Sequence, residues 1–155
     1  MFIRQYQIAD AEAIAAIYQN SVLGIGATAY NPEQIAAWSA YPDNLEEFRR
    51  SLQQGLTLVA VADEQLVAFG QLNPLDHIAF LYTASPAARQ GYATEIYQQL
   101  ETYAIQQGIE HLHTEASRIS KFFFLKMGYH ITETEVVTRK GVELERFKMA
   151  KLMRH

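Results

Sequence analysis

A strand–helix–strand pattern between residues 77 and 115 limits the fold of this chain more than any other feature of its sequence. The apolar run HIAFLYT (77–83) has the length of a buried strand, and IEHLHTE (109–115) has the alternation of a second one. Between them, a helix that ends at Gly108 carries one apolar stripe, formed by Ala93, Ile96, Tyr97, Leu100 and Ala104. Such a unit predicts two parallel strands joined by a right-handed crossover.

Strand-like segments on both sides of this unit extend the predicted sheet. They are residues 1–8, 56–62, 65–72, 129–138 and 142–152. Asp63-Glu64 and Arg139-Lys140-Gly141 are short connections that suit hairpins. Helices are predicted at residues 11–22, 31–38, 41–55 and 117–128. This order of elements favours an α/β fold, with a mixed sheet flanked by helices.

Capping residues set the predicted helix boundaries. Asp10 stands where the N-cap of the first helix belongs, and Asn31 followed by Pro32 begins the second. Glycines 24 and 26 break the helical pattern between these two helices. No internal repeat and no linker-like stretch interrupts the chain, so residues 1–155 are predicted to form a single domain.

Charge and composition exclude several classes of protein. The net charge of −4 argues against broad nucleic-acid binding, which needs a basic surface. The absence of cysteine removes disulfides, thiolate metal sites and cysteine nucleophiles. No stretch approaches the roughly 20 apolar residues of a membrane span, and the amino end lacks an apolar signal core. We therefore expect a cytoplasmic protein without membrane partners, as a monomer or a homodimer.

The turn that leads into the long helix has the features of an anion site. It follows the carboxyl end of the strand 77–83, where ligands of open sheets with parallel strands tend to bind. The first amide N–H groups of the helix lack internal partners, and the small residues Gly91 and Ala93 let a phosphate come close. Arg89 and Gln90 add donors. A glycine-bearing turn is also common punctuation before a helix, so this stretch alone leaves both interpretations open.

A second stretch, EASRISKFFFLKMGY (115–129), sorts its side chains onto two helical faces. Helical spacing places Ile119, Phe123 and Met127 on one stripe, which we expect to face the core. It places Ser117, Ser120 and Phe124 on another, a small hydroxylated face that suits a slender ligand. The alternative is a serine N-cap beside a phenylalanine cluster packed in the core.

Together and in this order, the two stretches resemble the Gcn5-related N-acetyltransferase (GNAT) family. ARQGYA (88–93) matches the Gln/Arg-x-x-Gly-x-Gly/Ala pyrophosphate loop, and SKFFFLKMGY (120–129) matches the later Ala-x-x-Phe-Tyr-x-x-x-Gly-Phe/Tyr helix. The openings IRQYQIADAEAIAAIY and YNPEQIAAW and the ending GVELERFKMAKL are similar to small bacterial members. The resemblance covers nearly the whole chain. It implies a mostly antiparallel sheet of six to seven strands, with one parallel pair around the loop helix.

The resemblance also implies an enzyme that transfers acetyl from acetyl-CoA to a small primary amine. Backbone N–H groups of the loop would hold the CoA pyrophosphate, involving Arg89, Gln90, Gly91, Tyr92, Ala93 and Thr94. The pantetheine arm would pair with the preceding strand, around Leu81, Tyr82 and Thr83. The later helix would flank the arm through Ser117, Ser120 and Phe124.

Two positions depart from the family pattern. Ala88 stands at the first loop position, so one side-chain contact is missing, although the backbone cradle does not depend on it. Phe124 stands where the family often has the tyrosine that protonates the departing thiolate. Tyr82 and Ser120 are the nearest hydroxyls that could replace it, with water as the alternative. A thiolate is already a tolerable leaving group, since thiol pKa values lie near 8 to 9.

Because the sequence offers no residue for a covalent intermediate, the expected mechanism is direct attack of the amine on the thioester. The chain has no cysteine for an acetyl-cysteine intermediate, and no GxSxG elbow for a serine route. The attacking amine must be neutral, and His77 and Glu115 are our first candidates for the base, ahead of Asp76 and His113. His111 and His113 have a spacing that can bind metal, but no further ligand accompanies them in the sequence, so we expect no metal.

The resemblance implies that the acceptor site is built from the segment of the chain between the first strand and the hairpin of residues 56–72. Tyr30 and Trp38 are the candidates to line a pocket for a small amine, although Trp38 can equally anchor its helix to the sheet. Two other functions stay open. In one, Phe124 marks a non-catalytic acyl-CoA-binding or sensing domain, and in the other the chain acetylates proteins in an open groove.

Overall fold

The computed structural model describes residues 1–84, 87–88 and 90–153, and within them seven strands form one sheet in the order β1-β2-β3-β4-β5-β7-β6. The strands are β1 (Phe2–Gln5), β2 (Leu56–Ala62), β3 (Gln65–Leu72), β4 (His77–Thr83), β5 (His111–Ala116), β6 (His130–Arg139) and β7 (Val142–Leu152). Neighbouring strands are antiparallel except β4 and β5. The predicted fold class, a mixed and mostly antiparallel sheet with one parallel pair, is confirmed.

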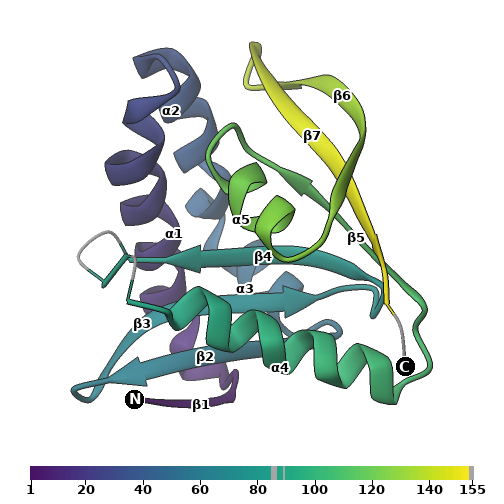
Figure 1. The fold of residues 1–155 in the computed structure, drawn as a ribbon. Helices are drawn as coiled ribbons and strands as arrows, with labels where there is room; N and C mark the ends of the chain where they lie inside the picture. The colour runs from purple at the N-terminus through teal and green to yellow at the C-terminus, as the bar shows by residue number, and fades with distance from the viewer. Residues whose placement is uncertain (85–86, 89, 154–155) are drawn as a thin grey trace.

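Helices cover both faces of the sheet (Figure 1). They are α1 (Ala11–Ile25), α2 (Pro32–Ser39), α3 (Leu45–Leu52), α4 (Tyr92–Gln106) and α5 (Ser120–Lys126). Figure 1 shows α4 and α5 on the near side, whereas α1, α2 and α3 lie behind the sheet. None of the helices in the described part of the chain is long and apolar enough to cross a membrane.

Each face of the sheet has its own apolar core. The stripe of α4 packs against β2, β3 and β4, and its Ile96 and Leu100 are fully buried. On the other face, Ile14 of α1 and Leu52 of α3 pack against Phe69 of β3. Burying a side chain of this size stabilises the fold by about 1.5–3 kcal/mol. The two cores hold the ends of β4 and β5 between two helical layers.

The parallel pairing of β4 with β5 is short. Only His77 with His113 and Ile78 with Thr114 are in register, so β4 runs on from there to Thr83 paired with β3 alone. A β-bulge lies at the same place, because Leu72 is opposite Ile78 while Gln71 is opposite Phe80. The extra residue is Ala79. A bulge bends its strand and re-aims the neighbouring side chains, so β4 and β5 part at this point.

The first strand is shorter than predicted, and Asp10 is the N-cap residue of α1 as predicted, although its side chain makes no capping bond to the helix. The Asp10 carboxylate accepts two hydrogen bonds from the Arg4 guanidinium, at 2.8 and 2.9 Å, and one from the Gln7 amide at 2.8 Å. These bonds hold Ile8–Asp10 in a 3-10 turn, so β1 ends at Gln5 and not at residue 8. The Asp10 carboxylate therefore stabilises the turn that precedes α1.

Two helix boundaries also differ from prediction. Helix α1 continues to Ile25 in spite of Gly24. The cost of one glycine in a helix is about 1 kcal/mol, and burial of Val22 in the core outweighs it. The helix predicted at 41–55 is a 3-10 turn at Tyr41–Asp43 followed by α3, which starts after Asn44 because the Asn44 side chain accepts the Glu47 N–H at 3.1 Å. The Asn31 cap and Pro32 of α2 are confirmed.

Candidate active site

One cavity of about 1260 Å³ lies where β4 and β5 part. Its walls come from the start of α4, the start of α5, helices α1 and α2, and the hairpin of β6 and β7. Small-molecule pockets usually occupy roughly 300–1,000 Å³, so this space is large enough for a long ligand and a second small one together.

The turn before α4 forms one wall and is built as an anion cradle. Gly91 is the N-cap residue of α4 with φ +85°, a left-handed conformation that favours glycine, and no side chain caps the helix there. The first bond inside the helix runs from the Glu95 N–H to the Gly91 carbonyl, which leaves the N–H groups of residues 92–94 without helical partners. A Cβ built on Gly91 would meet nothing within 4 Å, so the approach to these amides is open.

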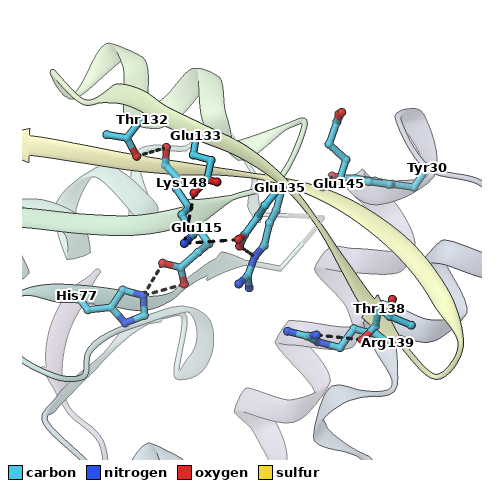
Figure 2. A network of polar contacts seen from close by, with 11 residues as sticks. Tyr30, His77, Glu115, Thr132, Glu133, Glu135, Thr138, Arg139, Glu145 and Lys148 are labelled. Atoms are coloured by element: carbon cyan, nitrogen blue, oxygen red, sulfur yellow. Dashed lines mark hydrogen bonds and ion pairs between the residues drawn. The ribbon is translucent and has the colours of Figure 1, made fainter.

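His77 and Glu115 face each other across the parallel pair (Figure 2). His77 Nε2 lies 2.9 and 3.2 Å from the two Glu115 carboxylate oxygens, and Nδ1 lies 2.9 Å from the Asn73 carbonyl oxygen. Both ring nitrogens therefore face groups that only accept hydrogen bonds, and the imidazole satisfies both when it carries two protons. Figure 2 shows the pair at the ends of their strands, with the ring pointing at the carboxylate.

The environment raises the pKa of His77 and lowers that of Glu115. Burial opposes a charge on His77, but the hydrogen bonds to Glu115 and Asn73 and the nearby carboxylate charges outweigh it, so its pKa lies above the ordinary value. For Glu115, the hydrogen bond from His77 lowers the pKa more than burial raises it. The pair thus holds one exchangeable proton inside the cavity.

Aromatic side chains form the wall on the side of α1 and α2. The rings of Tyr18 and Tyr82 lie 4.7 Å apart, those of Tyr30 and Trp38 lie 5.3 Å apart, and the Tyr18 hydroxyl donates to the Trp38 carbonyl at 3.1 Å. Burial raises the pKa of Tyr82, so its hydroxyl stays protonated at neutral pH. This wall presents π faces and tyrosine hydroxyls to the cavity.

The start of α5 closes the cavity on the other side of the gap. Ser120 Oγ accepts the Ser117 N–H at 2.9 Å, and Ser117 Oγ accepts the Ser120 N–H at 2.9 Å. The predicted core stripe is confirmed for Phe123 and Met127, which are half-buried and pack against the core, whereas Ile119 lines the cavity. Phe124, predicted on the ligand face, is 4% exposed and packs edge-on against Phe123. Phe124 therefore belongs to the core and also lines the cavity.

Histidine side chains also meet here. The rings of His77 and His113 stack at 4.7 Å, and ligand atoms of these two and Glu115 lie within 4.8 Å of one another, a spacing compatible with one metal ion. The partner of His113 in this cluster is His77 and not His111, the residue that the sequence pairs with it. Two of these three side chains, His77 and Glu115, are hydrogen-bonded directly to each other.

Comparison with known proteins decides the family. A family model described as an acetyltransferase (GNAT) domain matches residues 26–151. The chain belongs to the GNAT family of N-acetyltransferases. The Escherichia coli (strain K12) protein YafP, an uncharacterized N-acetyltransferase, is 27% identical over 148 residues, which are 95% of this chain and 93% of YafP.

Solved structures agree with this GNAT assignment. The crystal structure of a GCN5-related N-acetyltransferase from Rhodopseudomonas palustris is similar at a TM-score of 0.95 and 31% identity, over 98% of this chain and 95% of that one. PaiA N-acetyltransferase from Thermoplasma acidophilum, solved in complex with coenzyme A, shares the fold at a TM-score of 0.76 and 22% identity, over 98% of each chain.

In this GNAT chain, nearly all of the residues singled out in the sequence line the one cavity. They are Tyr30, Trp38, His77, Leu81, Tyr82, Thr83, Gly91, Tyr92, Ala93, Thr94, Glu115, Ser117, Ser120 and Phe124. Gln90 lies beside the cavity, where its side-chain oxygen accepts the Tyr92 hydroxyl at 3.2 Å. Arg89 lies outside the described residues.

Sequence reasoning missed three kinds of cavity residue. Tyr18 has the helical spacing of a core residue, and the structure places it both in the core and on the cavity wall. Ala79 carries no side-chain signal, because a bulge is a property of strand pairing. Arg139 and Lys140 stand in a hairpin turn, where the sequence gives no sign of a ligand, and both line the cavity.

Proposed function

We propose that this protein transfers the acetyl group of acetyl-CoA to a small primary amine by direct attack on the thioester. The observation that carries the proposal is that one cavity joins the anion cradle of α4, the unpaired part of β4, and the His77–Glu115 pair. The cradle suits a diphosphate, the strand edge suits an extended arm, and the pair suits proton removal. No other single arrangement of the described residues combines these three.

The donor is proposed to run from the cradle along β4. The amides of residues 92–94 and the dipole of α4 would bind the pyrophosphate, with no need for a side chain at Ala88. Residues 81–83 of β4 have no pairing with β5, so their main chain is open to the pantetheine arm. A main-chain N–H near the bulge at Ala79 would polarise the thioester carbonyl. PaiA, which shares the fold, binds coenzyme A.

The acceptor is proposed to lie against Tyr30 and Trp38, with its nitrogen toward Glu115. The amine must lose a proton to attack, and the His77–Glu115 pair receives it. Because the pKa of His77 is raised, its unprotonated form grows as pH rises above the ordinary histidine range, where more of the amine is neutral as well.

The nitrogen lone pair then attacks the thioester carbon, and the carbon–sulfur bond breaks as the amide forms. The sulfur leaves as a thiolate or takes a proton from Tyr82, Ser120 or water. Tyr82 stays protonated at neutral pH, but its raised pKa lies above that of a thiol, so transfer of its proton is uphill. Ser120 Oγ accepts an amide hydrogen and keeps its own proton to donate toward the sulfur.

Release of free CoA thiol from acetyl-CoA with a panel of amines tests the proposal. The panel contains alkylamines, aromatic amines, diamines and peptides with free amino termini, and mass spectrometry identifies the N-acetyl product. We expect turnover with small amines, loss of turnover in His77→Gln, and retention in the control His130→Gln, an exposed histidine outside the cavity.

Two outcomes would replace the proposal. Binding of acetyl-CoA without turnover on any amine would favour an acyl-CoA sensor, in which Phe124 reflects lost chemistry. Turnover on peptides alone would favour a protein N-acetyltransferase. It would mean that the aromatic wall does not select small amines as acceptors.

A further inference from the structure

The β6–β7 hairpin contributes a part of the cavity wall that the proposed reaction does not use. In its ladder Val137 is opposite Leu144 and Arg139 is opposite Val142. Val137 and Leu144 pack toward the core on the side of α1 and line the cavity. Since side chains two residues apart share a face of a strand, Arg139 lies on this same inner face. Arg139 and Lys140 both line the cavity.

The hairpin is held in place by α2 and by a tight turn. Gln34 Nε2 of α2 donates to the Glu143 carbonyl at 3.1 Å, and the Tyr30 hydroxyl donates to the Glu145 carbonyl at 3.4 Å. Lys140 and Gly141 have φ of 50° and 75°, as a two-residue hairpin turn requires. The base of the Arg139 side chain is therefore fixed, which lowers the ordering cost of binding a ligand there.

Arg139 has no carboxylate partner in the described part of the chain. Its guanidinium donates to the neighbouring Thr138 carbonyl at 3.1 Å, and Figure 2 shows this as its only marked contact. The other arginine on the cavity wall, Arg146, is paired with Glu135, and Glu145 is paired with Arg118 at 3.1 Å. The hairpin thus presents a guanidinium without a carboxylate partner among the described residues to a cavity that the Glu115 carboxylate also lines.

We propose that the acceptor is an amine that also bears a carboxylate. Its amino group lies at the His77–Glu115 pair, its carboxylate is bound by Arg139 with Lys140 beside it, and the aromatic wall holds the chain between them. A guanidinium matches a carboxylate with two parallel N–H donors, so it fixes direction as well as charge. This inference rests on the proposed function and specifies the class of substrate for the same cavity.

Matched pairs of acceptors test the inference. We compare 6-aminohexanoate with hexylamine, and phenylalanine with phenethylamine, by the ratio of their kcat/KM values. For the pair whose length fits, we expect an advantage of about tenfold for the carboxylate, the modest size expected for an ion pair that water still reaches. Arg139→Gln should bring the ratio close to one, and Arg139→Lys should restore part of it.

The control variant is Arg50→Gln, an exposed arginine of α3 outside the cavity, which should keep the ratio. If no amine of either kind is acetylated, the proposed function fails and this inference with it. If amines are acetylated but the carboxylate gives no advantage, or Arg139→Gln keeps the advantage, only this inference fails. Weaker CoA binding by Arg139→Gln in calorimetry would assign the guanidinium to the donor and would also overturn it.

Discussion

Two glycines at opposite ends of α4 separate the binding role of the cradle from its effect on stability. Gly91 precedes the helix with φ +85°, and Gly108 follows it with φ +81°. Both are exposed, and a Cβ on either meets nothing within 4 Å, so neither substitution creates a clash. We expect Gly91→Glu to abolish measurable CoA binding and Gly108→Glu to retain it.

The magnitudes follow from the geometry. Each variant places a side chain in a left-handed conformation at a cost of about 1–2 kcal/mol, which for a chain of this length lowers Tm by about 2–8 °C. Only Gly91→Glu brings a carboxylate to the phosphate site, where two unit charges about 4 Å apart repel by about 4 kcal/mol near a protein surface. Water screens part of this at an exposed turn, so we expect Kd to rise about 100-fold or more.

Isothermal titration calorimetry with CoA gives the two affinities, and thermal unfolding gives the two stabilities. Similar decreases of Tm in the two variants would show that the left-handed backbone destabilises both proteins to the same extent. A Gly91→Glu protein that binds CoA within about threefold of the Gly108→Glu protein would refute the cradle as the phosphate site.

Three further substitutions probe the cavity. Glu115→Gln replaces the charged acceptor beside His77 with a neutral amide, so NMR titration should show a lower pKa for His77. The unprotonated imidazole then persists to lower pH, and kcat/KM should be retained to lower pH, whereas Glu46→Gln on α3 should change neither. Tyr82→Phe should lower kcat about tenfold. The effect is smaller than the roughly 100- to 10,000-fold usual for a general acid, because the pKa of the Tyr82 hydroxyl lies above that of a thiol. An unchanged kcat would remove Tyr82 from the mechanism. Ala88→Arg should bind CoA equally well or up to about fivefold tighter, as for an exposed ion pair, and a severe loss in calorimetry would mean that the loop is misregistered.

Local signals in the sequence were enough to place several strands. Strands β2, β3, β4 and β7 begin and end at the predicted residues. Their apolar patterns are bounded by turn residues that act on their immediate neighbours: Asp63 and Glu64 adopt φ of 51° and 64°, which closes the β2–β3 hairpin. Such information is contained in each strand and the turn beside it, so it can be read without the rest of the fold.

Features that depend on pairing between distant segments could not be read in this way. Strand β7 lies between β5 and β6, and the bulge at Ala79 exists only in register with β3. The contact between His77 and Glu115 arises because His77 is opposite His113, two residues before Glu115. The sequence proposed both residues, but only the register shows that they form a pair.

Side chains with two plausible roles were the main source of error. Asp10 has the residue type and the position of an N-cap. Its carboxylate nevertheless binds the guanidinium of Arg4, six residues earlier, instead of the helix amides. Phe124 has both of the roles that the sequence leaves open, because it lines the cavity and is also the most buried residue of α5, beside Tyr129. Which helical face points inward depends on the sheet beneath it.

A crystal structure of the protein with CoA and a slowly reacting amine is the most direct test of acetyl transfer in this cavity. We predict the pyrophosphate within hydrogen-bonding distance of the amides of residues 92–94, the sulfur beside Ala79 between β4 and β5, and the amine between Trp38 and Glu115. CoA bound away from the start of α4, or a sulfur that does not reach the gap between β4 and β5, would contradict the proposed reaction.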